Sequence, residues 1–254
     1  MRCVIRSTGI LMRCVLQPIR SSTVLLIAMG MTGFVPAWSA TPNDLTGFWA
    51  LRVDSRNVPQ AQLLPTITAK QIAQHQAADR NAIRWCLPVG VPSLMDAASN
   101  IGIVQGAKEV AVRSEAPSAA RHIYLDRDQP PSADVYEPTT NGFSIGHWEG
   151  AALLVETTGF SDQGVTEIPG GGYRTPTSKL MERYELVDHG RQLQVTFTWT
   201  DPNVYAQPHT YAFRYYRMPA EYNAGEVLCD SSDADRADFL TKAPTPVTGP
   251  RSHP

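Results

Sequence analysis

Short segments with a two-residue hydrophobic period fill most of the chain between residues 101 and 217. In the clearest, 193–200 (LQVTFTWT), the apolar side chains face one way and the intervening glutamine and threonines face the other. A sheet with one buried and one solvated face requires this alternation. We therefore expect strands at 46–53, 101–105, 109–113, 121–126, 142–148, 152–158, 178–187, 192–200 and 210–217.

Turn-forming residues separate the expected strands, and one segment has the features of a helix. Thr68 and Gln71 make a capping box in front of the alanine- and glutamine-rich stretch 69–82, which we expect to be helical. The stretch 170–175, GGGYRT, is interpreted as a lid or crossover. The expected fold is all-β and mainly antiparallel: a lipocalin-like barrel or a strongly bent sandwich, with one flanking N-terminal helix.

The first 39 residues have the pattern of a signal peptide. Four arginines and no acid precede a short apolar run, and Ala37-Trp-Ser39 presents small residues where signal peptidase cleaves. The apolar run is too short to span a bilayer, and a membrane anchor is the alternative interpretation. Translation starts at either Met1 or Met12. We expect a periplasmic or secreted protein with a signal peptide at 1–39, a single domain at 40–242 and a disordered proline-rich tail at 243–254.

The charge of the exported chain argues against polyanionic partners. Cleavage removes four of the 22 Lys and Arg and none of the 24 acids, which leaves a net formal charge near −6. No cluster of basic residues counteracts this excess. We therefore expect neither nucleic acid nor an anionic membrane surface as a partner.

Two cysteines, Cys86 and Cys229, remain after cleavage. In an oxidising compartment such a pair most simply forms one disulfide, and two buried free thiols are the alternative. The bond closes a loop of more than a hundred residues and contributes roughly 4–5 kcal/mol in the chain-entropy model. Neither cysteine has a second metal ligand at short spacing, so we expect no cysteine-based metal site.

Two resemblances agree with these expectations. Gly47-Phe-Trp49 is similar to the Gly-x-Trp opening of the lipocalin-like, or calycin, barrels. The segments CLPVGVP, RHIYLDRD, SIGHWEG, LLVETTGF, SKLMERYELVD and DPNVYAQP, which span 86–208, resemble an uncharacterised family of exported bacterial proteins. The pattern of that family has an aspartate after WEG, where this chain has Ala151. The resemblance implies a coherent exported fold and implies no particular activity.

Polar side chains on otherwise apolar strands are the candidates for chemistry, because the chain has no H-E-x-x-H, phosphate-loop or dinucleotide motif. Parity puts His147 and Glu149 on the face of Phe143 and Ile145, and Glu182 on the face of its apolar neighbours. A polar group on an apolar face must be paired or must lie at a rim. We therefore expect His147, Glu149 and Glu182 inside the barrel or at its mouth.

The remaining candidates lie on the strand 121–126 and beside Glu182. Tyr124 and Asp126 share one face, opposite Arg121, and Arg183 lies opposite Glu182. Simpler interpretations stay open: a solvated hairpin end for His147 and Glu149, and a structural ion pair for Glu182-Arg183. A metal site of three histidines is a further alternative, with ligands His122, His147 and His209.

The function that we expect is a cofactor-free acid/base lyase, decarboxylase or isomerase acting on a small hydrophobic molecule, aromatic ones included. In this interpretation His147 or Glu149 is the base and Tyr124 the acid, while Arg121 or Arg183 holds an oxyanion or carboxylate. Asp126 and Glu182 complete the expected substrate-binding residues. The alternative is a non-catalytic periplasmic protein that binds a ligand or associates with the envelope.

Overall fold

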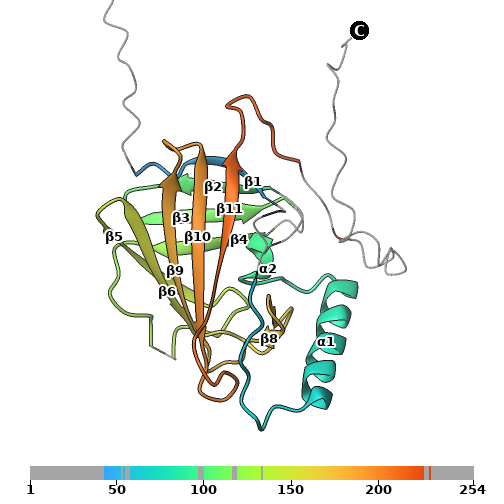
Figure 1. Ribbon diagram of the computed structural model, residues 1–254. Helices are drawn as coiled ribbons and strands as arrows, with labels where there is room; N and C mark the ends of the chain where they lie inside the picture. The colour runs from blue at the N-terminus through green and yellow to red at the C-terminus, as the bar shows by residue number, and fades with distance from the viewer. Residues whose placement is uncertain are drawn as a thin grey trace, which may run out of the picture. The chain divides into compact units, whose positions relative to one another are not determined.

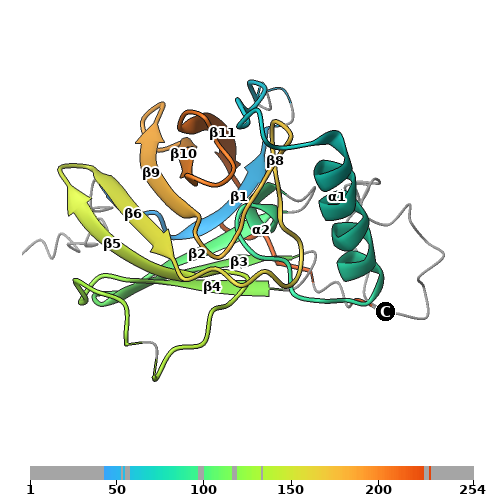
Figure 2. The same cartoon turned by 90° about the horizontal axis from the view of Figure 1, so that it is seen from below.

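The computed structural model describes residues 43–52, 54, 58–96, 100–115, 119–132, 134–225 and 229. The expected signal peptide and the expected disordered tail lie outside these residues. Nine strands form a closed barrel in the order β1-β11-β10-β9-β6-β5-β4-β3-β2 (Figures 1 and 2). They are β1 (Gly47–Leu51), β2 (Ile101–Gln105), β3 (Glu109–Ser114), β4 (Ala119–Tyr124), β5 (Phe143–Glu149), β6 (Ala152–Thr158), β9 (Lys179–Val187), β10 (Gln192–Thr200) and β11 (His209–Arg217).

The predicted all-β, mainly antiparallel class is confirmed, and the barrel rather than the bent sandwich is correct. Every join between neighbouring barrel strands is antiparallel except the one between β4 and β5. That parallel join is also short, because it pairs only Ile123 with Ser144 and Tyr124 with Ile145. The long chain segment between β4 and β5 returns β5 to run beside β4 in the same direction, as a crossover connection must.

The interior of the barrel is filled by side chains. Along β10, Val195, Phe197 and Trp199 are fully buried, which confirms the predicted inward face of this strand. The short helix α2 (Ser93–Asp96) contributes Met95, whose carbonyl accepts a hydrogen bond of 2.9 Å from the hydroxyl of Tyr215 on β11. Apolar burial of this kind is the main source of stability for a barrel of this size.

The predicted helix is α1 (Ala69–Arg84), which lies outside the ring of strands (Figure 2). Thr68 and Gln71 form the capping box that the sequence predicts. At the other end, the backbone N–H of Cys86 donates to Ile83 at 3.1 Å, and that of Leu87 donates to Ala82 at 2.9 Å. These two bonds make a Schellman turn, in which Cys86 occupies with φ 55° the left-handed position that usually holds glycine.

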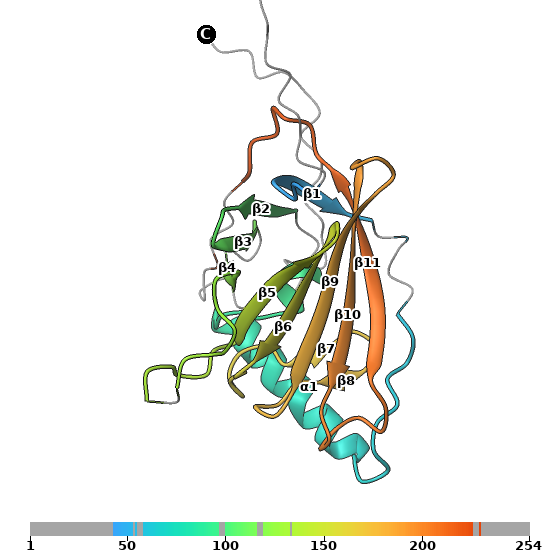
Figure 3. The same cartoon turned by 90° about the vertical axis from the view of Figure 1, so that its left-hand side faces the viewer.

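Two further strands, β7 (Glu167–Ile168) and β8 (Gly172–Tyr173), form a small hairpin in the segment that we expected to be a lid or crossover. The hairpin lies between the barrel and α1 (Figures 1 and 3). Gly170 and Gly171 make its turn with φ of 94° and 89°, a backbone conformation that favours glycine. The hairpin therefore depends on the same glycines that suggested an irregular loop.

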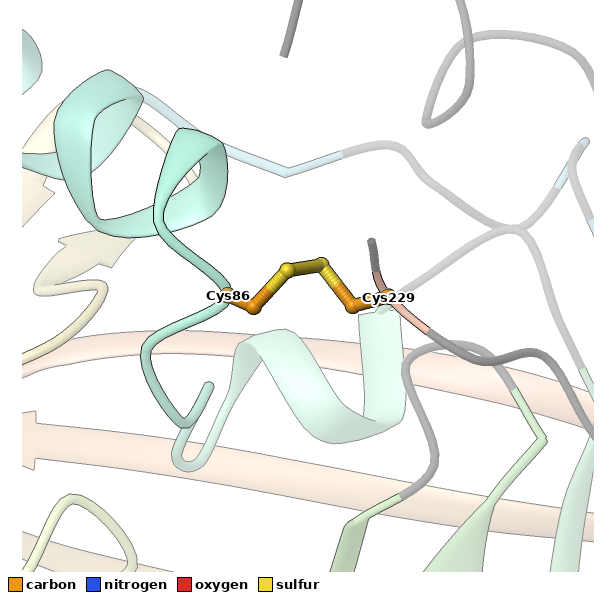
Figure 4. Close-up of a disulfide and its surroundings, with 2 residues drawn as sticks. All are labelled: Cys86 and Cys229. Carbon is orange, nitrogen blue, oxygen red and sulfur yellow. A yellow bond between two sulfur atoms is a disulfide. The ribbon is translucent and has the colours of Figure 1, made fainter. Parts of the chain in front are cut away.

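A disulfide joins Cys86 to Cys229, as predicted (Figure 4). The two Cα atoms are 5.7 Å apart, within the range that a disulfide requires. The bond connects the end of α1 to a position beyond the last barrel strand. No helix within the described ranges is both long enough and apolar enough to cross a membrane.

Candidate functional site

An ion pair between Arg121 on β4 and Glu182 on β9 lies inside the barrel. The Nη2 atom of Arg121 is 2.5 Å from Oε2 of Glu182, and Nη1 is 2.9 Å from Oε1, so the two groups meet through two parallel contacts. Both side chains are completely buried. A carboxylate and a guanidinium in this fork geometry form the strongest type of protein ion pair.

Three hydroxyl groups surround this pair and complete its hydrogen bonds. Arg121 donates at 2.9 Å both to Ser144 on β5 and to Thr157 on β6. The hydroxyl of Tyr184 donates to Glu182 at 2.9 Å. We call Arg121, Ser144, Thr157, Glu182 and Tyr184 the interior polar cluster.

The interior polar cluster is sealed and satisfied within itself. Burial alone would lower the pKa of Arg121, but the adjacent Glu182 carboxylate raises it above the ordinary value, so the guanidinium stays charged. Burial, and then the charge of Glu182, raise the pKa of Tyr184 well above its usual range, so the phenol stays protonated. Groups that are fully buried and fully paired are not presented to a substrate, and we interpret the cluster as structural.

The two residues expected as catalytic base lie on the outer wall of the barrel. His147 and Glu149 are exposed, and Glu149 meets Arg183 at 3.4 Å across the surface. The side chains of Glu149 and Arg183 are 66% and 41% exposed. The structure therefore does not bring His147 and Glu149 together with the buried Arg121 and Glu182, whereas Glu149 does meet Arg183 of the expected set.

The error arose from Phe143, which is buried but on the outside of the barrel. Its ring stacks on Tyr124 with centroids 5.0 Å apart and meets Tyr136, from the β4–β5 connection, edge-on at 5.3 Å. The inward residues of β5 are Ser144, Gly146 and Trp148, which pair with buried residues of β6. When a loop covers an apolar residue on the outer face of a strand, parity alone assigns the inward and outward faces of that strand the wrong way round.

The other predicted residues are also separated from the ion pair. Tyr124 is half-buried in the aromatic contact described above, and Asp126 is exposed, with Lys108 at 3.9 Å. The structure thus brings together Arg121 with Glu182 inside, and Glu149 with Arg183 outside. His122 and His147 are exposed whereas His209 is buried, and no group of three metal-ligating side chains occurs in the described part of the chain.

A small hollow lies between α1 and the β7–β8 hairpin, and we call it the α1–hairpin hollow. Its enclosed space is about 10 Å³, which is room for roughly one water molecule. A second, open hollow of about 350 Å³ lies on the outer wall near Arg52 and Arg214. The α1–hairpin hollow is lined by Ile72, His75, Gln76, Asp79, Glu167, Gly171, Gly172 and Tyr173.

Asp79 attaches the hairpin to the helix. One carboxylate oxygen accepts from the backbone N–H and the hydroxyl of Thr166, at 2.8 and 3.0 Å. The other accepts from the backbone N–H of Glu167 at 2.8 Å. Asp79 is buried, so these three hydrogen bonds replace the water that its charge has lost.

His75 lies one helical turn before Asp79 and shares its face of α1, as an i, i+4 spacing requires. Its ring stacks on Tyr173 with centroids 3.7 Å apart, and its Nδ1 atom is 3.3 Å from the hydroxyl oxygen of Thr166. Thr166 uses its single hydroxyl hydrogen toward Asp79, so its oxygen must accept a hydrogen from His75. This chain of hydrogen bonds assigns the proton to Nδ1 and leaves Nε2 of neutral His75 as a base.

The pKa values of two groups in the hollow are moved toward one another. Burial lowers the pKa of His75 from its ordinary value of 6.5. Burial, and then the neighbouring Asp79 carboxylate, raise the pKa of Glu167 from 4.5. A lowered histidine pKa and a raised carboxyl pKa reduce the difference in proton affinity between the two groups, which favours proton transfer in one hollow.

Our sequence reasoning missed this hollow because it searched strands for polar residues. The signal that would have indicated it is the spacing of His75 and Asp79 in HQAAD, four residues apart on the predicted helix. The partner residues Thr166 and Glu167 come from a segment without detectable periodicity. No protein-family model and no curated protein matches the chain.

Proposed function

We propose that the chain is an exported, lipocalin-like acid/base enzyme that acts without a cofactor at the α1–hairpin hollow. The observation that carries this proposal is the hydrogen-bond chain from His75 through Thr166 to Asp79, beside the half-buried Glu167. Here the Thr166 hydroxyl, itself bonded to Asp79, accepts from Nδ1 of His75 and orients the ring, which leaves the other ring nitrogen as a general base. The reaction class is that of a lyase, decarboxylase or isomerase.

His75 and Glu167 have complementary roles in this proposal. Nε2 of His75 accepts a proton from the substrate, and the positive charge that develops on the ring is stabilised by Asp79 through Thr166. Glu167, whose pKa is raised, delivers a proton to another atom of the substrate. After the reaction His75 carries the extra proton and Glu167 lacks one. Water returns this proton from His75 to Glu167, and the site is ready for another cycle.

The size of the hollow restricts how a substrate binds. Because about 10 Å³ is enclosed, only the reacting end of a small molecule enters, and the remainder lies against the outside. Ile72 and the stacked rings of His75 and Tyr173 offer an apolar, partly aromatic border. A hydrophobic or aromatic molecule with an acidic C–H or a carboxylate next to that carbon fits this border.

The exported location is part of the proposal. A disulfide between Cys86 and Cys229 is characteristic of periplasmic and secreted proteins, since cytosolic thiols are kept reduced. The N-terminal pattern of residues 1–39 supports the same location. The resemblance to exported bacterial proteins and to lipocalin-like barrels, whose closed barrel this chain shares, supports it as well.

The second candidate function is a non-catalytic periplasmic protein that binds a ligand or associates with the envelope. The sealed interior polar cluster favours it, because the barrel does not present these polar groups to a ligand. Both candidates predict the Nδ1–H tautomer of His75. They differ in its role: an enzyme uses this tautomer for proton transfer, whereas a non-catalytic protein uses it only for the stability of the hairpin.

The experiment has two stages. First, nitrogen NMR of the mature protein measures the tautomer and pKa of His75, and we expect Nδ1–H with a pKa below 6.5. Second, small aromatic and aliphatic carbonyl acids are incubated with the protein in D₂O, and mass spectrometry detects exchange of carbon-bound hydrogen. We expect exchange with the parent protein and a loss of about 10²-fold or more with His75→Gln or Glu167→Gln.

His122→Gln is the matched control, because this histidine is exposed on the outer wall. It should exchange hydrogen at the rate of the parent protein. An Nε2–H tautomer would contradict the site itself. The correct tautomer without exchange of any probe, or with equal exchange by His75→Gln, would favour the non-catalytic candidate.

A further inference from the structure

Three exposed apolar residues gather where α1 ends. Ile83 is 37% exposed, Trp85 63% and Leu87 45%. Single exposed apolar residues are common on protein surfaces, but three within five positions of the chain concentrate apolar surface at this end of the helix. We call these three residues the α1-end patch.

The α1-end patch is held in place by the backbone. The Schellman turn fixes the direction of the chain between Ile83 and Leu87, and Trp85 is the C-cap of the helix. Cys86 lies within the patch and is bonded to Cys229. A rigid turn therefore holds the three residues, which cannot move into the protein interior unless the end of the helix unfolds.

The disulfide also fixes where the C-terminal segment begins. Cys229 has its Cα 5.7 Å from that of Cys86, so the segment that follows Cys229 in the sequence is tethered next to the patch. The sequence that follows, DSSDADRADFL, ends on Phe239 and Leu240, the only adjacent pair of large apolar residues after Cys229. Ten residues reach at most about 36 Å, longer than the whole of α1 at about 24 Å, so the pair can reach the patch easily.

Charge favours the same arrangement. Four aspartates precede Phe239 in this segment, at positions 230, 233, 235 and 238. On α1 the basic residues Arg80 and Arg84, within one turn of the patch, are exposed. An acidic segment is attracted to this end of the helix, although exposed charge pairs contribute little each and are weakened by salt.

We propose that residues 230–240 dock on the α1-end patch, with Phe239 and Leu240 covering Trp85 and its neighbours. The tether gives the segment an effective concentration in the millimolar range, so even a contact with a millimolar Kd is formed about half of the time. Formation of the disulfide thus holds residues 230–240 close enough to bind the α1-end patch. This inference is independent of the function proposed for the α1–hairpin hollow.

The test is oxidative labelling of the mature, disulfide-bonded protein, with the rate of modification at Trp85 followed by mass spectrometry. Trp148 provides an internal reference in the same sample, since it is half-buried on a barrel strand. We expect Phe239→Ser/Leu240→Ser to raise the rate at Trp85 about twofold or more. Val247→Ser, a matched loss of an apolar residue further along the same tail, should leave the rate unchanged.

Salt gives a second measurement of the same contact. Raising the ionic strength from about 0.05 to 0.5 M should increase labelling of Trp85 in the parent protein and have little effect in the double variant. Equal rates in the parent and double variant would overturn the proposal. Protection of Trp85 that persists in the double variant, together with a dimer mass by light scattering, would show that a second copy covers the patch and would also overturn it.

Discussion

The buried ion pair between Arg121 and Glu182 gives the sharpest test of the fold. Arg121→Met removes the guanidinium but leaves Glu182 in a site with no exposed surface, where among the described residues the hydroxyl of Tyr184 remains as its partner. Breaking a buried pair in this way costs about 3–5 kcal/mol. Because a domain has only about 5–15 kcal/mol of stability in total, we expect a large fall in the urea midpoint.

The double variant Arg121→Met/Glu182→Leu should be more stable than either single variant. Two apolar groups of similar volume remove the orphaned charge, and such replacements of buried pairs are often close to neutral. Ser144 and Thr157, whose oxygens are 2.9 Å apart, still satisfy one another. The remaining cost is then about 1–3 kcal/mol, for the partner that the Tyr184 hydroxyl loses.

The assay is urea unfolding of the oxidised mature chain, with the free energy of unfolding obtained for the parent, both single variants and the double variant. The reasoning predicts strong coupling, so that the double variant loses less than either single variant. Additive losses would refute it, and so would single-variant losses below about 1 kcal/mol, since water would then reach the pair.

Three further predictions concern other parts of the molecule. Trp199→Ala should lower the free energy of unfolding by about 3–5 kcal/mol in urea titrations, because its side chain is fully buried; a loss under about 1 kcal/mol would contradict this. Cys229→Ser should lower it by up to about 5 kcal/mol by freeing a loop with a sequence separation of 143, and calorimetry showing an unchanged midpoint would rule out the cross-link. Burial lowers the pKa of His75, so the unfolded chain takes up the proton first, and stability should fall as pH drops below 6.5; His75→Gln should flatten this slope, and an unchanged slope would exclude His75 as its source.

Most strands were predictable because their period reflects a purely local requirement. The strands Ile101–Gln105, Ala152–Thr158 and Gln192–Thr200 begin and end where the alternation does. Burial of Phe197 and Trp199 followed from the same pattern. A barrel wall buries one face continuously, so alternation and burial agree wherever nothing covers the outer face.

The candidate site was harder to predict because its residues meet through tertiary contacts. The chain between β4 and β5 covers Phe143 from outside, and nothing in β5 itself indicates this cover. Glu182 was correctly placed inward, but its partner is Arg121, 61 residues away, and not the adjacent Arg183. The contact between His75 and Thr166 spans 91 residues, and no periodic pattern carries information over that distance.

The position of the interior polar cluster bears on how the barrel moves. Its arginine comes from β4 and its hydroxyl and carboxylate partners from β5, β6 and β9, so it spans the join that has the fewest backbone pairs. Separating β4 from β5 would pull a guanidinium away from its counter-charge in a dry interior. The ion pair thus opposes separation of β4 and β5, although few backbone hydrogen bonds join these strands. We therefore expect the amide hydrogens of Ile123 and Tyr124 to exchange only when the whole barrel unfolds. We therefore expect no opening between β4 and β5 through which a ligand could enter the interior of the barrel.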